Sequence, residues 1–169
     1  MPYTARALRM GMVLLALAGC GRSADEEIAL SAAPVHTVVA ALSKPGAWKP
    51  GKCLCVGHFR EDAVEDFPAG VLDAEYAAHP WLHKWSECAP YYGRVQGPMG
   101  CAEGMTDFIC SVSERSDLPK GTARVLCHVN GESEALKWQY LQDEYDVTFA
   151  NGRYSVRPVS RQGSNMPNE

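Results

Sequence analysis

The chain has 169 residues, with 20 acidic and 16 basic side chains and a formal net charge of −4. It lacks the basic footprint of a nucleic-acid-binding protein, so we expect no nucleic-acid partner. The length suits one domain with a core of its own.

The N-terminal segment has the pattern of a secretory signal. Arg6 and Arg9 are followed by the uncharged residues 10–19. An apolar stretch of about ten residues fits the roughly 7–15 of a signal peptide and is short of the roughly 18–20 that a spanning helix needs. The sequence Leu-Ala-Gly-Cys at 17–20 resembles the lipobox of bacterial lipoproteins. The resemblance covers residues 1–20 only, and it makes 1–19 the signal peptide.

The resemblance implies a lipid anchor. In that family the cysteine of the lipobox begins the mature chain, its sulfur carries a diacylglycerol, and its freed amine carries a third acyl chain, such as palmitate. Cys20 is then the lipid-attachment site, and three chains hold a protein on a membrane stably. Gly21 stands where an inner-membrane retention signal would place Asp, which favours the outer membrane with the domain facing the periplasm. The alternative is an ordinary cleaved secretory signal.

Beyond the anchor, we expect a flexible tether over residues 20–30, one globular domain over 31–159 and a frayed tail over 160–169. Pro34 suits the first position of a helix, and the apolar residues that follow it recur at helical spacing until Lys44-Pro45-Gly46 stops the pattern. From residue 52 to 59 the period changes to two. This predicts a strand with both of its cysteines on one face.

Residues 60–106 are rich in glycine and proline and are predicted to be mostly loop, with a short helix near 71–78. Alternating apolar residues then predict a hairpin over 107–130 with its turn at 117–120. Asn130-Gly131 predicts a further turn into a strand. That strand contains Leu136, Trp138 and Tyr140.

Asn151-Gly152 is the favoured pair for a type I′ turn, and a two-residue loop there sets Phe149 opposite Tyr154. The elements together predict an α+β domain. We expect an antiparallel β-meander of about five strands, stapled by disulfides, with one N-terminal helix packed on it.

The cysteines other than Cys20 are even in number, as in the disulfide framework of an exported chain. They are Cys53, Cys55, Cys88, Cys101, Cys110 and Cys127. The predicted hairpin register places Cys110 opposite Cys127, which leaves the two strand cysteines to bond Cys88 and Cys101. The competing set joins Cys88 to Cys101 and pairs the strand cysteines across the sheet.

Metal binding has one candidate pattern, Cys53-x-Cys55-x-x-His58, because thiolate and imidazole are ligands for zinc and copper. We expect these cysteines to be oxidised instead, and the spacing is not the paired C-x-x-C of common zinc folds. The sequence therefore predicts no metal and no cofactor.

Catalytic motifs such as G-x-S-x-G, H-E-x-x-H and phosphate-binding glycine loops are not found in the sequence. Two acidic patches are interpreted as solvated surface. They are Glu61, Asp62, Glu65 and Asp66, and Asp143, Glu144 and Asp146. No catalytic residue is predicted.

The most distinctive stretch for binding is 76–105, where aromatic residues lie among prolines and glycines between two cysteines. A covalently fastened loop loses less entropy on binding, and Trp, Tyr and Arg are common hot-spot residues. The predicted partner-binding residues are Trp81, Trp85, Tyr91, Tyr92 and Arg94. Alternatively, Trp81 and Trp85 form one buried helical face and the loop is only structural.

These features predict a lipid-anchored envelope protein that binds another protein without catalysis, for example as an immunity protein, an inhibitor or an accessory subunit. The alternative is an envelope enzyme, or a lipoprotein that binds a small ligand or metal, using His58, His79 or His128.

Overall fold

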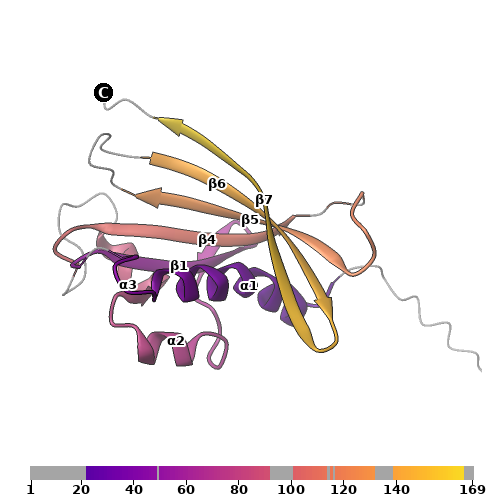
Figure 1. The fold of residues 1–169 in the computed structure, drawn as a ribbon, viewed down its shortest axis with the longest axis horizontal. Coiled ribbons are helices and arrows are strands. Elements are labelled where there is room, and N and C mark those ends of the chain that lie inside the picture. The colour runs from indigo at the N-terminus through magenta and orange to yellow at the C-terminus, as the bar shows by residue number, and fades with distance from the viewer. Residues whose placement is uncertain are drawn as a thin grey trace, which may run out of the picture.

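A mixed β-sheet with one long helix across it forms the body of the molecule (Figure 1). The computed structural model describes residues 22–48, 50–91, 101–113, 115, 117–131 and 139–165. The sheet has seven strands, in the order β2-β1-β4-β5-β6-β7, and β3 also pairs with β1. The predicted α+β class is confirmed. The predicted meander of about five antiparallel strands is wrong.

The strands span Cys53–Arg60 (β1), Ala63–Glu65 (β2), Leu82–Lys84 (β3), Met105–Ser113 (β4), Thr122–Gly131 (β5), Gln139–Ala150 (β6) and Arg153–Asn165 (β7). β1 pairs in parallel with both β3 and β4, and the other pairings are antiparallel. A parallel pair needs a long crossover between its strands. Here the chain between β1 and β4, predicted to be mostly loop, supplies β2, β3 and three short helical segments.

Helix α1 (Ala24–Leu42) begins ten residues before Pro34, the predicted start. The Ser23 side chain accepts a hydrogen bond from the Glu26 backbone N–H at 3.2 Å, which caps the helix. Residues 24–30, predicted to belong to a flexible tether, are therefore helical. Pro34 lies inside the helix, where it removes one backbone hydrogen bond, and it is fully buried.

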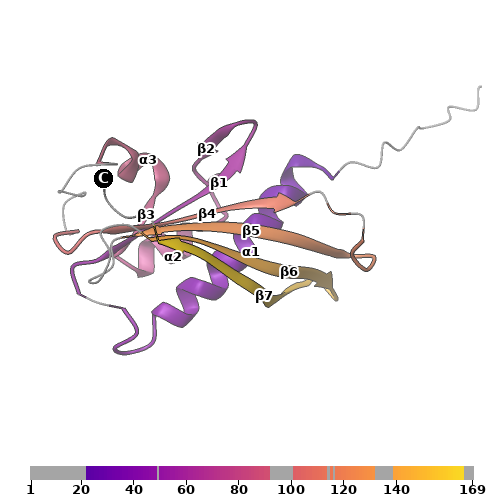
Figure 2. The same ribbon diagram turned by 90° about the horizontal axis from the view of Figure 1, so that it is seen from above.

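Seen from above, α1 runs across the sheet (Figure 2). Its buried face, which includes Leu30, Val35 and Val39, packs on residues of β1, β4, β5 and β6 to form the core. Burial of this face stabilises the helix against the cost of the internal proline.

Short helices occupy the crossover. They are α2 (Asp73–Ala78), α3 (Trp85–Cys88) and the 3₁₀ helix η1 (Ala89–Tyr91). The predicted short helix near 71–78 is confirmed by α2.

The predicted hairpin over 107–130 is confirmed, with Cys110 directly opposite Cys127. The Asn151-Gly152 turn is also confirmed: both residues have positive φ, 54° and 73°, and Phe149 lies opposite Tyr154. The predicted turn at Asn130-Gly131 is wrong, because both residues belong to β5.

Strand β7 reaches Asn165, so the predicted frayed tail is a strand over residues 160–165. Residues 166–169 lie outside the described part of the chain, as do two residues of the predicted strand, Leu136 and Trp138.

Three disulfides staple the fold: Cys53–Cys101, Cys55–Cys88 and Cys110–Cys127. This is the set in which the β1 cysteines bond Cys88 and Cys101, and the competing set is wrong. The first two bonds lie on the face of β1 opposite to the core residues Leu54 and Val56, because side chains alternate along a strand. They fasten the crossover to β1.

The acidic patch on β6 forms ion pairs rather than a solvated surface. Asp146 accepts hydrogen bonds from Arg124 and Arg157, and Asp143 accepts two from Arg161. Asp143, Asp146 and Arg124 are buried. A buried carboxylate needs such partners, and these link β5, β6 and β7.

Candidate functional site

A groove lies at the C-terminal end of α1, between the chain that leaves the helix and the chain that enters β3. It encloses about 450 Å³. We call it the tryptophan groove. Its lining includes Leu42, Lys44, Trp48, Lys52, His79 and Trp81. Two tryptophans and two lysines thus share one concave surface, which combines broad apolar faces with cationic side chains.

The indole of Trp48 stabilises the turn in which this residue lies. Gly46, four residues beyond the end of α1, adopts a φ of 76°, and Trp48 Nε1 donates a hydrogen bond to the Lys52 carbonyl at 2.8 Å. Gly51 has a φ of 79°, and a Cβ placed there would meet Glu103 Cγ at 2.8 Å. The groove wall is therefore a closed turn in which Gly51 has no room for a side chain.

Trp81 lies on the opposite wall and contacts two other aromatic rings in tilted geometry. The Trp81 ring lies 5.5 Å from Trp48 and 5.0 Å from His79, centroid to centroid. His79 Nε2 lies 3.1 Å from the Ser43 hydroxyl, whose hydrogen is donated to the Val39 carbonyl. His79 must then donate through Nε2, because the serine hydroxyl has only one hydrogen. These contacts fix Trp81 against the end of α1.

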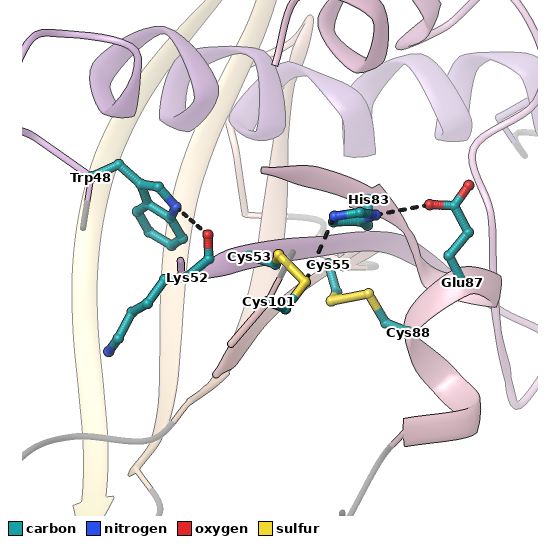
Figure 3. Close-up of a disulfide and its surroundings, with 8 residues drawn as sticks. All are labelled: Trp48, Lys52, Cys53, Cys55, His83, Glu87, Cys88 and Cys101. Atoms are coloured by element: carbon teal, nitrogen blue, oxygen red, sulfur yellow. Dashed lines mark hydrogen bonds and ion pairs between the residues drawn. A yellow bond between two sulfur atoms is a disulfide. The ribbon is translucent and has the colours of Figure 1, made fainter. Parts of the chain in front are cut away.

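Two disulfides lie next to this groove (Figure 3). Cys53 directly follows Lys52 and bonds Cys101, and Cys55 bonds Cys88. Both bonds are buried. The groove therefore borders a part of the sheet that is cross-linked by disulfides.

Figure 3 shows His83 beside the Cys53–Cys101 disulfide, with its ring between Cys101 and Glu87. Its Nε2 is 3.7 Å from Cys101 Sγ, and its Nδ1 is 3.1 Å from Glu87 Oε2. Cys53, His83 and Cys101 come close enough to hold a metal ion. Both sulfurs are bonded to each other, however, and a disulfide offers no thiolate for a metal.

The candidate pattern Cys53-x-Cys55-x-x-His58 has no thiolate to offer a metal, because Cys53 and Cys55 are bonded to other cysteines, as the sequence predicted. His58 is buried, with its ring 5.2 Å from that of Phe67, and burial lowers its pKa. Burial also lowers the pKa of His128, which lies on β5 opposite Ile109.

The three histidines named for the alternative function, an envelope enzyme or a ligand-binding lipoprotein, lie in different parts of the fold. His79 lines the tryptophan groove, His58 lines a separate hollow at the start of α1, and His128 lies in the middle of β5.

The five predicted partner-binding residues are not brought together either. Trp81 lines the groove, whereas Trp85 begins α3 and lies over Gly57 of β1, and Tyr91 ends η1. Tyr92 and Arg94 lie outside the described residues, and so does Cys20. The alternative of one helical face for Trp81 and Trp85 is wrong, because β3 separates them. Trp81 does pack against the core, as that alternative expected.

Sequence reasoning missed Trp48, Ser43 and Lys52, which complete the groove. The available signal was a tryptophan between two Pro-Gly steps, Pro45-Gly46 and Pro50-Gly51, a pattern typical of an ordered turn.

One carboxyl group, that of Asp107, is buried beside the disulfide-bonded Cys55. Asp107 on β4 lies opposite Cys55 in the parallel register and is 4% exposed. Burial raises its pKa to about 6.

No match to this chain was found among protein family models, curated proteins or solved structures. Among the described helices, none has the length and apolar character needed to cross a membrane.

Proposed function

We propose that this protein is a lipid-anchored protein of the cell envelope that captures a protein partner in the tryptophan groove, without catalysis. The observation that carries the proposal is the position of the groove relative to the start of the mature chain. The groove lies at the C-terminal end of α1, and Cys20 precedes the N-terminal end. A helix of 19 residues separates the two ends.

The helix sets the distance between anchor and groove. At 1.5 Å per residue, α1 is about 28 Å long. A chain spans at most about 3.6 Å per residue, so Ser23 lies within about 11 Å of Cys20. With a lipid on Cys20, the first turn of α1 is held near the membrane surface, and the groove is at the far end of the helix. The domain therefore presents its groove to the periplasm.

The groove chemistry indicates the kind of partner. Tryptophan faces bind proline or aliphatic side chains, and a lysine beside them favours a carboxylate. Lys44 is exposed at the rim. The fitting partner is an exposed segment of another envelope protein with an acidic residue next to an apolar one. An immunity protein, an inhibitor or an accessory subunit of an envelope assembly would bind in this way.

Cross-linking from the groove tests the proposal. A photo-crosslinking residue at Lys44 is expected to capture one partner in intact cells, and the same residue at Lys120, an exposed position on the β4–β5 turn, is expected to capture none. With the identified partner purified, Lys44→Glu and Trp81→Ala should each weaken binding at least tenfold, equivalent to about 1.4 kcal/mol.

Lys120→Glu is the matched control and should leave affinity unchanged. Because Trp81 also packs on the core, melting curves must accompany its variant. The exposed Lys44 gives a result that does not depend on stability. Unchanged affinity in both groove variants would rule the groove out as the binding surface.

A further inference from the structure

The tip of the β6–β7 hairpin carries an exposed aromatic pair. Phe149 and Tyr154 lie directly opposite each other, with ring centroids 4.8 Å apart. They are 54% and 40% exposed, and the type I′ turn at Asn151-Gly152 joins them. Aromatic side chains of this size are usually buried in small domains, so a cross-strand pair left in solvent at a hairpin tip indicates a contact surface.

This tip lies at the same end of the molecule as the start of α1 (Figures 1 and 2). The strand pairings also place exposed aromatic residues at this end of the molecule. Phe59, which is 47% exposed near the end of β1, lines one hollow with Arg22 and Ala24. β1 and β4 run parallel, and the hairpin tip reaches the β4–β5 turn, where the Phe149 N–H donates to the Gly121 carbonyl. Three of the four large hydrophobic side chains exposed in the described residues therefore lie at the anchored end.

The charges at the tip suit a lipid interface. The hairpin tip carries the exposed Arg153, and the exposed Lys120 lies on the neighbouring turn together with Asp117. Arg157, farther along β7, is ion-paired with Asp146. Aromatic rings favour the boundary between headgroups and acyl chains, and long basic side chains reach the phosphates from there. The acidic first turn of α1, at the same end, opposes attraction to a purely anionic surface. The contact should therefore depend on the aromatic rings more than on anionic lipid.

We propose that the β6–β7 hairpin tip is a second membrane contact, in which Phe149 and Tyr154 insert into the lipid interface beside the acylated Cys20. This inference rests on the proposed lipid anchor. Two points of attachment, one covalent and one through the hairpin, would fix the orientation of the domain. The tryptophan groove would then be held away from the membrane, whereas a single flexible attachment would let it rotate.

The test uses the mature lipidated protein in phosphatidylethanolamine vesicles whose acyl chains carry bromine, which quenches tryptophan fluorescence at short range. Two variants, Phe149→Trp and Val159→Trp, are compared with the parent protein. Val159 is 40% exposed on the same strand as Tyr154. It lies five residues farther from the tip, about 17 Å along an extended strand.

The inference predicts that the fluorescence added by Phe149→Trp is quenched and that added by Val159→Trp is not, with little change when phosphatidylglycerol is included. If the protein is acylated on Cys20 but neither variant is quenched, the hairpin contact is wrong while the anchor stands. Equal quenching of both variants would show that β7 lies along the membrane, which also overturns the inference. A blue shift of Phe149→Trp that grows with protein density, without quenching, would assign the tip to a second copy of the chain. Finally, absence of acylation on Cys20 overturns the anchor and this inference together.

Discussion

Replacement of Asp107 by asparagine should make the protein more stable at neutral pH. The carboxyl is buried on β4, and burial raises its pKa from an ordinary 3.8 to about 6 in the folded protein. The folded state therefore binds the proton more tightly than the unfolded state does. As pH rises from about 4 to about 6, the unfolded state ionises first, and the free energy of unfolding falls.

The size of the effect follows from the two pKa values. A difference of about two units corresponds to about 3 kcal/mol, because each unit is about 1.4 kcal/mol. Asp107→Asn removes the ionisation and keeps nearly the same shape. Its gain over the wild type should be up to about 3 kcal/mol above pH 7 and should disappear near pH 4.

Urea unfolding of both proteins from pH 4 to pH 8, with the disulfides intact, measures this difference. Because the comparison is made at each pH, contributions from other titrating groups cancel. Asp117→Asn serves as a control of opposite sign, since the hydrogen bond from Arg115 lowers the pKa of that exposed carboxyl. Its variant should lose a little stability at neutral pH. A gain for Asp107→Asn that is the same at every pH would refute the reasoning, because an effect unrelated to ionisation does not depend on pH.

Two further predictions concern the sheet. Asp146→Ala leaves the buried Arg124 with Glu144 as its one ion-pair partner among the described residues, and it should cost about 3 kcal/mol of unfolding free energy in urea titrations. A loss below about 1 kcal/mol would mean that water replaces the carboxylate. Changing both Cys110 and Cys127 to serine opens a loop of 17 residues and should cost about 3 kcal/mol, and an unchanged melting temperature would contradict a stabilising bond.

Local patterns in the sequence predicted the local parts of the fold. The hairpin register follows from its turn position and the alternation of its apolar residues, and it placed Cys110 opposite Cys127 correctly. The Asn151-Gly152 turn followed from the conformations that these two residues accept. In both cases the paired residues lie close in sequence, so a short pattern determines their contact.

The sequence contains no comparable pattern for contacts between residues that lie far apart along the chain. The parallel pairing of β1 with β4 joins segments about fifty residues apart, and neither strand's pattern specifies its partner. The tryptophan groove has the same origin, because it combines Trp48 after α1 with Trp81 before β3. The start of α1 was missed for a different reason: Ser23 and Glu26 have the spacing of a capping box, but the charged residues around them resemble a tether.

Intact-mass spectrometry of the protein purified in detergent from bacteria that express the full chain measures whether Cys20 is the acylated N-terminus. The proposed lipid anchor requires a chain that begins at Cys20 and carries the mass of a diacylglycerol and an amide-linked acyl chain. An unmodified N-terminus at any other residue would contradict it.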